Sequence, residues 1–505
     1  STNYNSQDNA MLDGAHVQVD VPLPGFIGMN NLQASSITAY ARARSKNRDI
    51  DADFTPIPFI VDHLVKPAAY QQLSQEFRLS GSSPDLFGFG HGVQFITGVY
   101  LLQSRYDVLE QFGLQDLGGA LVYCTAADPG SHNCNQNAPG GLGTIAQALA
   151  APLSQLLPYL GPQVNDQNVT TALNQKESLI AGFGQFEYLF LENWALIGGV
   201  RYGTESKRAY LSAQASSQIV QAIANSDNFS DTLRRTERDY SPKGGIRYNF
   251  DKNASAYFTW ARGYKSGGFN GLPLRSTQNE FGPERAGSYE FGAKGQFLDN
   301  RLRASMSLYT TDFDDLQLST YQNNRFIVLN AGVARSQGFE SDLQWLPEFA
   351  PFLLLRGSMG YADARYVSYP NAPCYSDAPD NCTQNLAGAR LPFGSRWTGS
   401  FTPDVFFPLG NGLRGTVGAD MNYRTSRYLD VDNDPRKLQA ATTLYNAHLT
   451  INDGSQKWAF TFAVRNISNV LAFDQRLGQP LAPGNFASSG PTLPRTFLQS
   501  ISYRF

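Results

Sequence analysis

Two stretches decide the fold, KWAFTFAVRNIS at Lys457–Ser468 and TFLQSISYRF at Thr496–Phe505. Only a β-strand sorts residues with a period of two. In the first stretch one face is apolar and the other is small or polar (Trp458, Phe460, Phe462, Val464 against Ala459, Thr461, Ala463, Arg465). The second repeats this pattern, with two residues out of phase (Phe497, Ile501, Tyr503, Phe505 against Ser500, Ser502, Arg504; Leu498 and Gln499 out of phase). Such strands suit a boundary between lipid and a polar lumen, so we predict a transmembrane β-barrel.

Composition agrees with a barrel. The chain has 505 residues with 12% aromatic residues, 46 Gly and 5 Met, and no run of eighteen apolar residues. A barrel keeps mean hydropathy low because only alternate strand residues must be apolar. The net charge of −3 (40 − 43) argues against a nucleic-acid partner. An outer-membrane protein needs a signal peptide, so we expect that it was removed or that the gene product starts earlier than Ser1.

The chain divides into seventeen candidate strands whose connections alternate between short turns and long loops. This alternation is typical of an outer-membrane barrel, with turns and the C-terminus in the periplasm and long loops extracellular. One loop, near Gln322 to Asn324, is brief. The candidate strands are 16–23, 32–45, 70–81, 92–106, 177–190, 194–213, 237–250, 254–267, 285–298, 301–320, 325–346, 351–368, 394–408, 412–428, 440–452, 457–468 and 496–505.

An odd number of strands is unusual, because single-chain bacterial barrels normally have an even number. If the last strand is even-numbered, the first candidate strand is even-numbered as well. We therefore expect the chain to begin in mid-barrel, with Ser1 to Ala15 as the end of an extracellular loop.

A family resemblance follows from motifs along the whole chain. The segments are Ser36–Tyr40 (SITAY), Ser74–Leu79 (SQEFRL), Gly198–Tyr202 (GGVRY), Tyr257–Asn270 (YFTWARGYKSGGFN), Ser288–Lys294 (SYEFGAK), Arg301–Gln317, Asn330–Glu340 and Val464–Asn469 (VRNISN) with terminal Phe505. In this order they resemble barrel strands of TonB-dependent outer-membrane receptors. They are most similar to the large proteobacterial group that resembles iron-siderophore receptors.

The resemblance implies parts that these residues do not supply. Family members carry a TonB box, a plug domain and a barrel of about twenty-two strands. Seventeen of about twenty-two strands leave five missing. If the first candidate strand is even-numbered, the number of strands before it is odd, which agrees with five. We expect residues 1–505 to be a partial barrel whose plug and first strands belong to a separate polypeptide or were not included. The rival is a plugless passive pore or surface-binding outer-membrane protein, although an open barrel exposes unpaired strand edges to hydrocarbon.

The resemblance implies energised uptake of a small molecule, such as a siderophore, rather than enzymatic chemistry. The partners would be outer-membrane lipid, the small-molecule ligand and a TonB energy-transducing complex acting through the plug. We expect ligand contacts from inward-facing polar residues high on the strands. Wall residues or contacts to the plug are the alternative for each of them. The candidates are Arg262, Lys265, Asn270, Arg424, Arg427, Tyr366 and Tyr369.

Four cysteines form two close pairs in loop-like segments, Cys124 with Cys134 and Cys374 with Cys382. Without CxxC spacing, two loop disulfides in an oxidising compartment are expected, each contributing on the order of 3 kcal/mol. The first pair lies in a long extracellular loop, 107–176. Leucines at helical spacing in that loop predict a short helical cap, interrupted by Pro152 and Pro158.

Other candidate chemistry is weak. Two acidic runs, 49–53 and 430–434, place carboxylates at alternate positions, which suits calcium, but both lack the glycine and glutamate of an EF-hand loop. We expect solvated acidic loops there. The five histidines are scattered without metal-ligand spacing, and no cofactor is indicated. No Ser, His and acid spacing suggests the alternative of an enzymatic barrel.

Overall fold

The fold described here is that of a computed structural model. It describes residues 7–25, 28–51, 60–85, 92–114, 167–322, 325–375, 378, 382–455, 457–479 and 482–504. Within these ranges, no helix has the length and apolar composition to cross a membrane.

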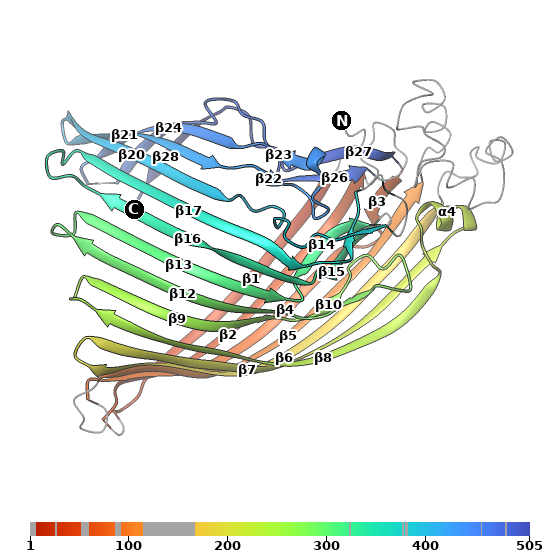
Figure 1. Ribbon diagram of the computed structural model, residues 1–505, viewed down its shortest axis with the longest axis horizontal. Coiled ribbons are helices and arrows are strands. Elements are labelled where there is room, and N and C mark those ends of the chain that lie inside the picture. The colour runs from red at the N-terminus through yellow and green to blue at the C-terminus, as the bar shows by residue number, and fades with distance from the viewer. Residues whose placement is uncertain are drawn as a thin grey trace.

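The wall is one large antiparallel sheet of eighteen strands (Figure 1). Because β3 and β4 both pair with β2 and β5, they share one place, and seventeen strand positions remain. Each position corresponds to one of the seventeen predicted strands. The strands are β1 (Gln7–Pro22), β2 (Asn30–Asp51), β3 (Ile60–Leu64), β4 (Ala68–Ser83), β5 (Val93–Leu114), β6 (Asn168–Leu191), β7 (Trp194–Ala215), β8 (Phe229–Asn249), β9 (Ala254–Lys265), β12 (Glu284–Phe297), β13 (Leu302–Asp314), β16 (Val333–Trp345), β17 (Leu353–Ser368), β20 (Trp397–Gly410), β21 (Leu413–Arg424), β24 (Thr442–Asp453), β25 (Trp458–Arg465) and β28 (Thr496–Tyr503).

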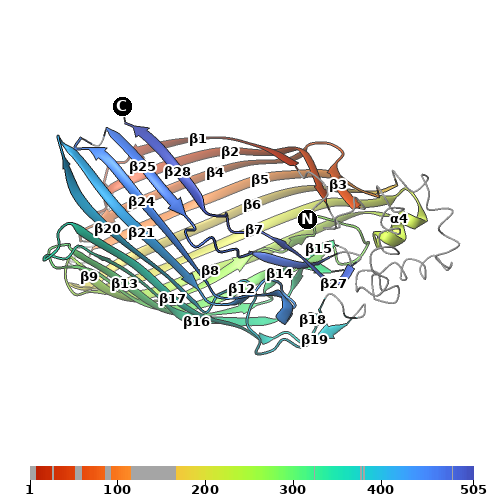
Figure 2. The ribbon, with the colours of Figure 1, turned by 90° about the horizontal axis from the view of Figure 1, so that it is seen from above.

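Smaller elements lie in the long connections, all at one end of the wall, which we call the loop end. Tight turns join the strands at the other, the turn end (Figure 2). The small elements are α4 (Gln218–Ile223), η3 (Pro435–Lys437) and five hairpin pairs, namely β10 (Gly268–Phe269) with β11 (Glu280–Phe281), β14 (Gln317–Gln322) with β15 (Arg325–Asn330), β18 (Ala372–Pro373) with β19 (Thr383–Gln384), β22 (Arg427–Tyr428) with β23 (Leu438–Gln439), and β26 (Gln475–Gln479) with β27 (Ala482–Ser489).

The register confirms the alternation predicted for the closing strands. Trp458 lies opposite Tyr503, and Phe460 opposite Ile501, so their side chains share one face of the sheet. Ile501 is 71% exposed, and the Trp458 and Tyr503 rings lie 4.5 Å apart. A large exposed apolar face on a sheet is stable only in lipid, so this face points outward from the barrel.

The wall has two unequal sides. Strands β1, β2 and β4–β8, the high wall, contain 16 to 24 residues each. Apart from β3, the remaining strands of the large sheet contain 8 to 16 residues each and form the low wall (β9, β12, β13, β16, β17, β20, β21, β24, β25 and β28). In Figure 1 the high-wall strands run further toward the loop end than β9 and β12 do. β9 pairs with β8 only from Lys243 to Asn249, within the described residues.

Several predicted boundaries were wrong. The strand predicted at 301–320 breaks, because Asp315 adopts a positive φ of 56° that β-strand pairing does not allow. The residues after it form the hairpin β14–β15, which is separate from the wall. β14 ends at Gln322 and β15 begins at Arg325, which agrees with the brief connection predicted there. The strand predicted at 325–346 divides into β15, which ends at Asn330, and β16, which begins at Val333. As at Asp315, a positive φ of 49° at Asn466 ends β25 at Arg465. The predicted loop 107–176 is shorter, because β5 continues to Leu114 and β6 begins at Asn168.

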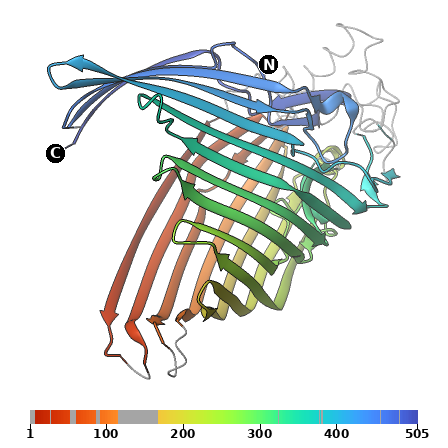
Figure 3. The same ribbon diagram turned by 60° about the vertical axis from the view of Figure 1, so that its left-hand side comes forward.

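The two ends of the sheet are β1 and β28. Within the described residues, β1 pairs only with β2, and β28 pairs only with β25. Figure 3 shows the first strands and the last strands as separate edges of the wall. Each edge strand therefore presents unpaired backbone N–H and C=O groups.

Candidate functional site: a collar of loops

Five connections at the loop end contact one another in sequence and form a continuous collar on the low wall. They are 266–283, 315–332, 369–396, 425–441 and 466–495, without their undescribed residues. The second and third are joined by a buried aromatic cluster, and the other neighbours are joined by side chains that bond to backbone groups. The first is also fixed to the inner face of the high wall. The collar is the candidate functional site.

The first loop is held by charged residues on the inward face of β7. Lys207 forms an ion pair with Glu205 at 2.6 Å and donates to the Gly267 carbonyl at 2.8 Å. The Ser266 hydroxyl donates to Glu205 at 2.8 Å. Both charged side chains are only 12–13% exposed, so water weakens these contacts little. The loop therefore lies against the high wall.

Neighbouring charges on β8 fix the same loop. Arg235 pairs with Glu237 at 2.7 Å and with Glu280 of the loop at 2.9 Å. Glu237 in turn accepts from the Tyr264 hydroxyl at 2.7 Å and from the Gly267 N–H at 2.9 Å. A carboxylate with three donors is well satisfied, which stabilises this corner of the lumen.

Asn270 and Gln317 join the first loop to the second. The Asn270 carboxamide accepts from the Val328 N–H and donates to the Gln278 carbonyl, both at 2.7 Å. Gln317 donates to the Ser266 carbonyl at 2.9 Å. Asn270 is only 2% exposed, so it is a structural bridge in this conformation, and its role as a ligand contact stays a prediction.

A buried aromatic cluster joins the second loop to the third. The Tyr366 and Tyr369 rings lie 5.1 Å apart and are 1% and 6% exposed. They pack with small and aliphatic residues of both loops and of β16 (Ala331, Ala334, Ala372, Leu386). Burial raises the pKa of Tyr369 to about 12. These two predicted contact residues therefore form the core of the collar, and the collar would have to open for a ligand to reach them.

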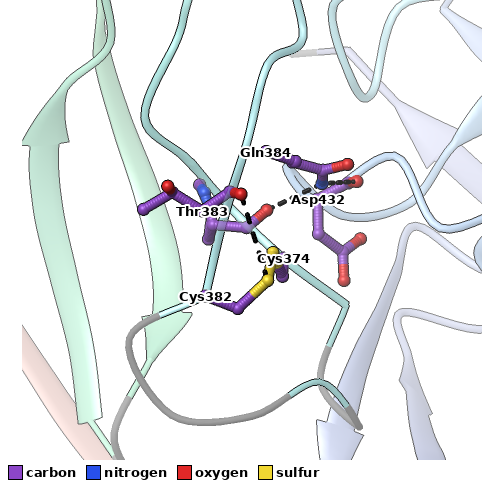
Figure 4. Close-up of a disulfide and its surroundings, with 6 residues drawn as sticks. Cys374, Cys382, Thr383, Gln384 and Asp432 are labelled. Atoms are coloured by element: carbon purple, nitrogen blue, oxygen red, sulfur yellow. Dashed lines mark hydrogen bonds between the residues drawn. A yellow bond between two sulfur atoms is a disulfide. The ribbon is translucent and has the colours of Figure 1, made fainter.

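The predicted disulfide Cys374–Cys382 is present, and it closes the third loop next to the fourth (Figure 4). Gln384, two residues beyond Cys382, donates to the Pro373 carbonyl at 2.7 Å and to the Asp432 carbonyl at 2.8 Å. The side-chain amide of Gln384 thus connects the disulfide loop to the acidic loop. The predicted pair Cys124–Cys134 and the predicted helical cap lie outside the described residues.

The acidic run 430–434 is buried and is not a solvated loop, which corrects the sequence prediction. Lys437 is 1% exposed and donates to Asp430 at 2.5 Å and to Asp432 at 2.6 Å. Burial and the negative charge of Asp430 raise the pKa of Asp432 to about 6. Burial alone would lower the pKa of Lys437, but the two carboxylates outweigh it and raise that pKa. The ammonium group of Lys437 therefore supplies the positive charge between the two carboxylates.

The fourth and fifth loops are joined by arginines. Arg427 pairs with Asp474 at 2.8 Å and donates to the Phe473 carbonyl at 3.1 Å. Arg476 donates to the Arg436 carbonyl at 2.9 Å. Arg427 is therefore engaged within the collar, and its partner Asp474 remains 73% exposed.

The remaining predicted contacts lie at the strand ends. Arg424 lies on the inward face of β21. Side chains alternate along a strand, and Met421 and Tyr423 are exposed on the outward face. Lys265 is exposed at the end of β9. Neither side chain forms an ion pair with a described residue. Arg262 differs from these two residues, because the register places it on the outward face of β9, the face of Phe258. It pairs with Asp239 at 3.5 Å and covers the Tyr240 ring.

Sequence reasoning missed the residues that join the collar, chiefly Lys437, Gln384 and Gln317. The alternating carboxylates of 430–434 with a lysine three residues later were the one available signal for the buried triad. Nothing local marks a glutamine that bonds to a backbone carbonyl 48 residues away. Within the described residues, no three His, Cys, Asp or Glu side chains form a group that could hold a metal ion.

Comparison with known proteins agrees with this architecture. A family model described as "TonB dependent receptor-like, beta-barrel" matches residues 3–467. The metal-pseudopaline receptor CntO of Pseudomonas aeruginosa (strain UCBPP-PA14) is 26% identical over 257 residues, which cover 50% of this chain and 32% of that protein.

Solved structures share the fold at low identity. The ferric yersiniabactin uptake receptor FyuA from Yersinia pestis is 14% identical with a TM-score of 0.70, covering 100% of this chain and 63% of that one. The copper transporter OprC is 13% identical with a TM-score of 0.62, covering 99% and 66%. This chain thus spans less than two thirds of these proteins. Since the family model covers most of the sequence, the chain belongs to the TonB-dependent receptor β-barrel family.

Proposed function

We propose that this chain forms most of the wall and the ligand-capturing mouth of an outer-membrane receptor that takes up a siderophore-like or other metal-carrying small molecule. The observation that carries this proposal is the collar. Five loops joined by hydrogen bonds, ion pairs and a buried aromatic cluster form a pre-organised ring at one end of a barrel of this family. Pre-organisation lowers the entropy lost on binding, so the ring suits capture of a scarce ligand.

The ligand contacts that we propose are the cations that the collar leaves unpaired. Arg424 on the inward face and Lys265 at the end of β9 are the candidates. The excess of positive charge favours an anionic ligand, such as a metal complex held by carboxylates or phenolates.

Further strands and a plug complete the receptor in this proposal. The edges of β1 and β28 lack partners among the described residues, and each unpaired group costs several kcal/mol in hydrocarbon. Seventeen positions fall five short of the roughly twenty-two strands of plugged outer-membrane transporters. A preceding segment or a separate polypeptide would supply these strands and the plug on which TonB acts. The loop end, in this arrangement, is extracellular and the C-terminus periplasmic.

Uptake by intact cells tests the function. Cells that express the receptor are given ferric complexes of different charge, and metal uptake is measured with and without an uncoupler of the proton-motive force. We expect uptake of at least one anionic complex that the uncoupler abolishes. Replacing Arg424 and Lys265 by Ala should weaken it by about tenfold, whereas Lys457→Ala in a turn should not. Uptake that persists without the proton-motive force would favour the passive pore.

Purification from outer membranes tests the architecture. Intact mass and N-terminal sequencing are measured under conditions that keep non-covalent partners attached. We expect a longer product or a second polypeptide with enough residues for a plug and about five strands. A barrel made of residues 1–505 alone would contradict the gated receptor.

A further inference from the structure

A row of cations crosses the outward face of the high wall. Arg105 of β5 lies opposite Lys176 of β6, Lys176 opposite Arg208 of β7, and Arg208 opposite Arg234 of β8. Residues directly opposite in a sheet share a face, so these four side chains, the cation row, lie side by side. All four are exposed.

The outward direction follows from the residues on the same face. Six positions from the cation row toward the turn end lies a second row in register, with Val99, Gly182, Tyr202 and Tyr240. Tyr202 is 54% exposed and Tyr240 is 53% exposed. Exposed aromatic residues of this kind mark the lipid boundary of a barrel. The inward residues of the same strands, such as Lys207, instead contact the collar.

The charges of the row are not balanced within this face. Arg105 pairs with Asp107, but Lys176, Arg208 and Arg234 form no ion pair with any described residue. Like charges directly opposite on neighbouring strands destabilise a sheet. An anion bound across the row would relieve this repulsion and satisfy the guanidinium donors, which match phosphate geometry.

The height of the row decides which anion fits. Six residues span roughly 20 Å along a strand, which is about 14 Å along the membrane normal for strands tilted by about 45°. An ordinary headgroup layer extends only about 5–8 Å beyond the hydrocarbon. The row lies above that layer, so an ordinary phospholipid phosphate would not reach it, whereas a lipid with a large sugar headgroup would.

The surroundings of the row suit sugars. A groove of about 710 Å³ is lined by the cation row and by the residues one row closer to the membrane. All of the latter except Leu73 carry a hydroxyl or amide group, and Tyr40 adds an aromatic ring (Tyr40, Leu73, Gln103, Ser178, Ser206, Thr236). Hydroxyl and amide groups can bond to sugar hydroxyls, and an aromatic ring can pack on a sugar face. The groove thus offers both kinds of contact that a phosphorylated sugar needs.

We infer that the cation row and its groove bind the phosphorylated sugar headgroup of an outer-leaflet glycolipid. The inference rests on the proposed orientation, with the loop end outside the membrane. It concerns the outer surface of the wall, so it is independent of the ligand that the collar takes.

The test compares the receptor purified from outer membranes with a variant carrying Lys176→Gln, Arg208→Gln and Arg234→Gln. Bound glycolipid is measured by native mass spectrometry. The matched control carries Lys243→Gln, Lys294→Gln and Arg303→Gln, three exposed cations on the inward face that form no ion pair with described residues. We expect the variant of the cation row to retain less glycolipid than the wild type by about tenfold. The control variant of the inward face should retain as much glycolipid as the wild type.

Nanodiscs separate the sources of anion. Delipidated receptor is placed in phosphatidylethanolamine discs with a phosphorylated glycolipid, with phosphatidylglycerol, or with inorganic phosphate in the buffer. Binding of the glycolipid alone supports the inference. Equal binding of phosphatidylglycerol or displacement by phosphate would overturn it, as would equal losses in the two triple variants. Heat-modifiable mobility in gel electrophoresis checks that each variant is folded. Loss of metal uptake without loss of bound glycolipid would count against the proposed function of the collar and not against the glycolipid site.

Discussion

The ammonium group of Lys437 lies 2.5 Å from a carboxylate oxygen of Asp430, although Lys437 is only 1% exposed. The second carboxylate, that of Asp432, lies 2.6 Å away. An acidic loop that resembles a calcium site in sequence is thus neutralised in part by its own chain. Because Asp432 also holds Gln384 of the disulfide loop through its carbonyl, the triad fixes two loops of the collar.

Lys437→Met should release the acidic loop. Removing one partner of a buried ion pair costs about 3–5 kcal/mol, because the carboxylates remain buried without a cation. We expect amide hydrogen exchange in 427–440 to become much faster, while exchange in the barrel strands is unchanged. Lys457→Met, in an exposed turn, serves as the control. Unchanged protection in 427–440 would show that the triad does not hold the loop.

Stability of the acidic loop should fall as pH rises from about 4 to about 6. The pKa of Asp432 is raised from 3.8 to about 6 in the fold, so the folded loop binds more protons than the opened loop across this range. The stabilisation that protonated Asp432 gives the folded loop is therefore complete below pH 3.8. It is lost as pH rises through about 6, the pKa of Asp432 in the folded loop. Exchange rates of 427–440, corrected for intrinsic chemistry, measure it. Asp432→Asn should remove the pH dependence, and a dependence that survives this change would have another source.

Reducing Cys374–Cys382 should loosen only the third loop. The bridge spans eight residues, and closing so short a loop contributes roughly 2–3 kcal/mol in the chain-entropy account. We expect limited proteolysis between the cysteines to accelerate in the double Cys→Ser variant and in reduced wild type alike. If only the double variant is affected, the serine substitutions rather than the lost bridge are responsible.

Charge on the outward face should block assembly, whereas charge on the inward face should not. Phe186 is 42% exposed and lies opposite Gly198, between the aromatic rows at Trp194 and Tyr202. Phe186→Lys should cost about 2–4 kcal/mol near the bilayer midplane. The neighbouring Gln185→Lys faces the lumen and should be tolerated. The amount of heat-modifiable receptor in outer membranes measures the difference, and equal amounts for both variants would reverse the assigned faces.

The sequence by itself determined the wall. Alternation with a period of two is a local property, so each of the seventeen strand positions could be found from it, as could the outward face of β25 and β28. It also placed Arg424 on the inward side of its strand and paired Cys374 with Cys382, since eight residues bring two cysteines close in any loop.

Only the tertiary structure decided the collar and the cation row. Asn270 bonds to a residue 58 positions away, and Gln384 to one 48 positions away. Arg105 and Lys176 become neighbours only through strand register across an interval of 71 residues, as their numbers give. Burial of Asp430 and Asp432 likewise depends on loops from distant strands that pack over them. Contacts between distant residues leave no local period in a sequence, because they depend on where whole strands are placed in the wall.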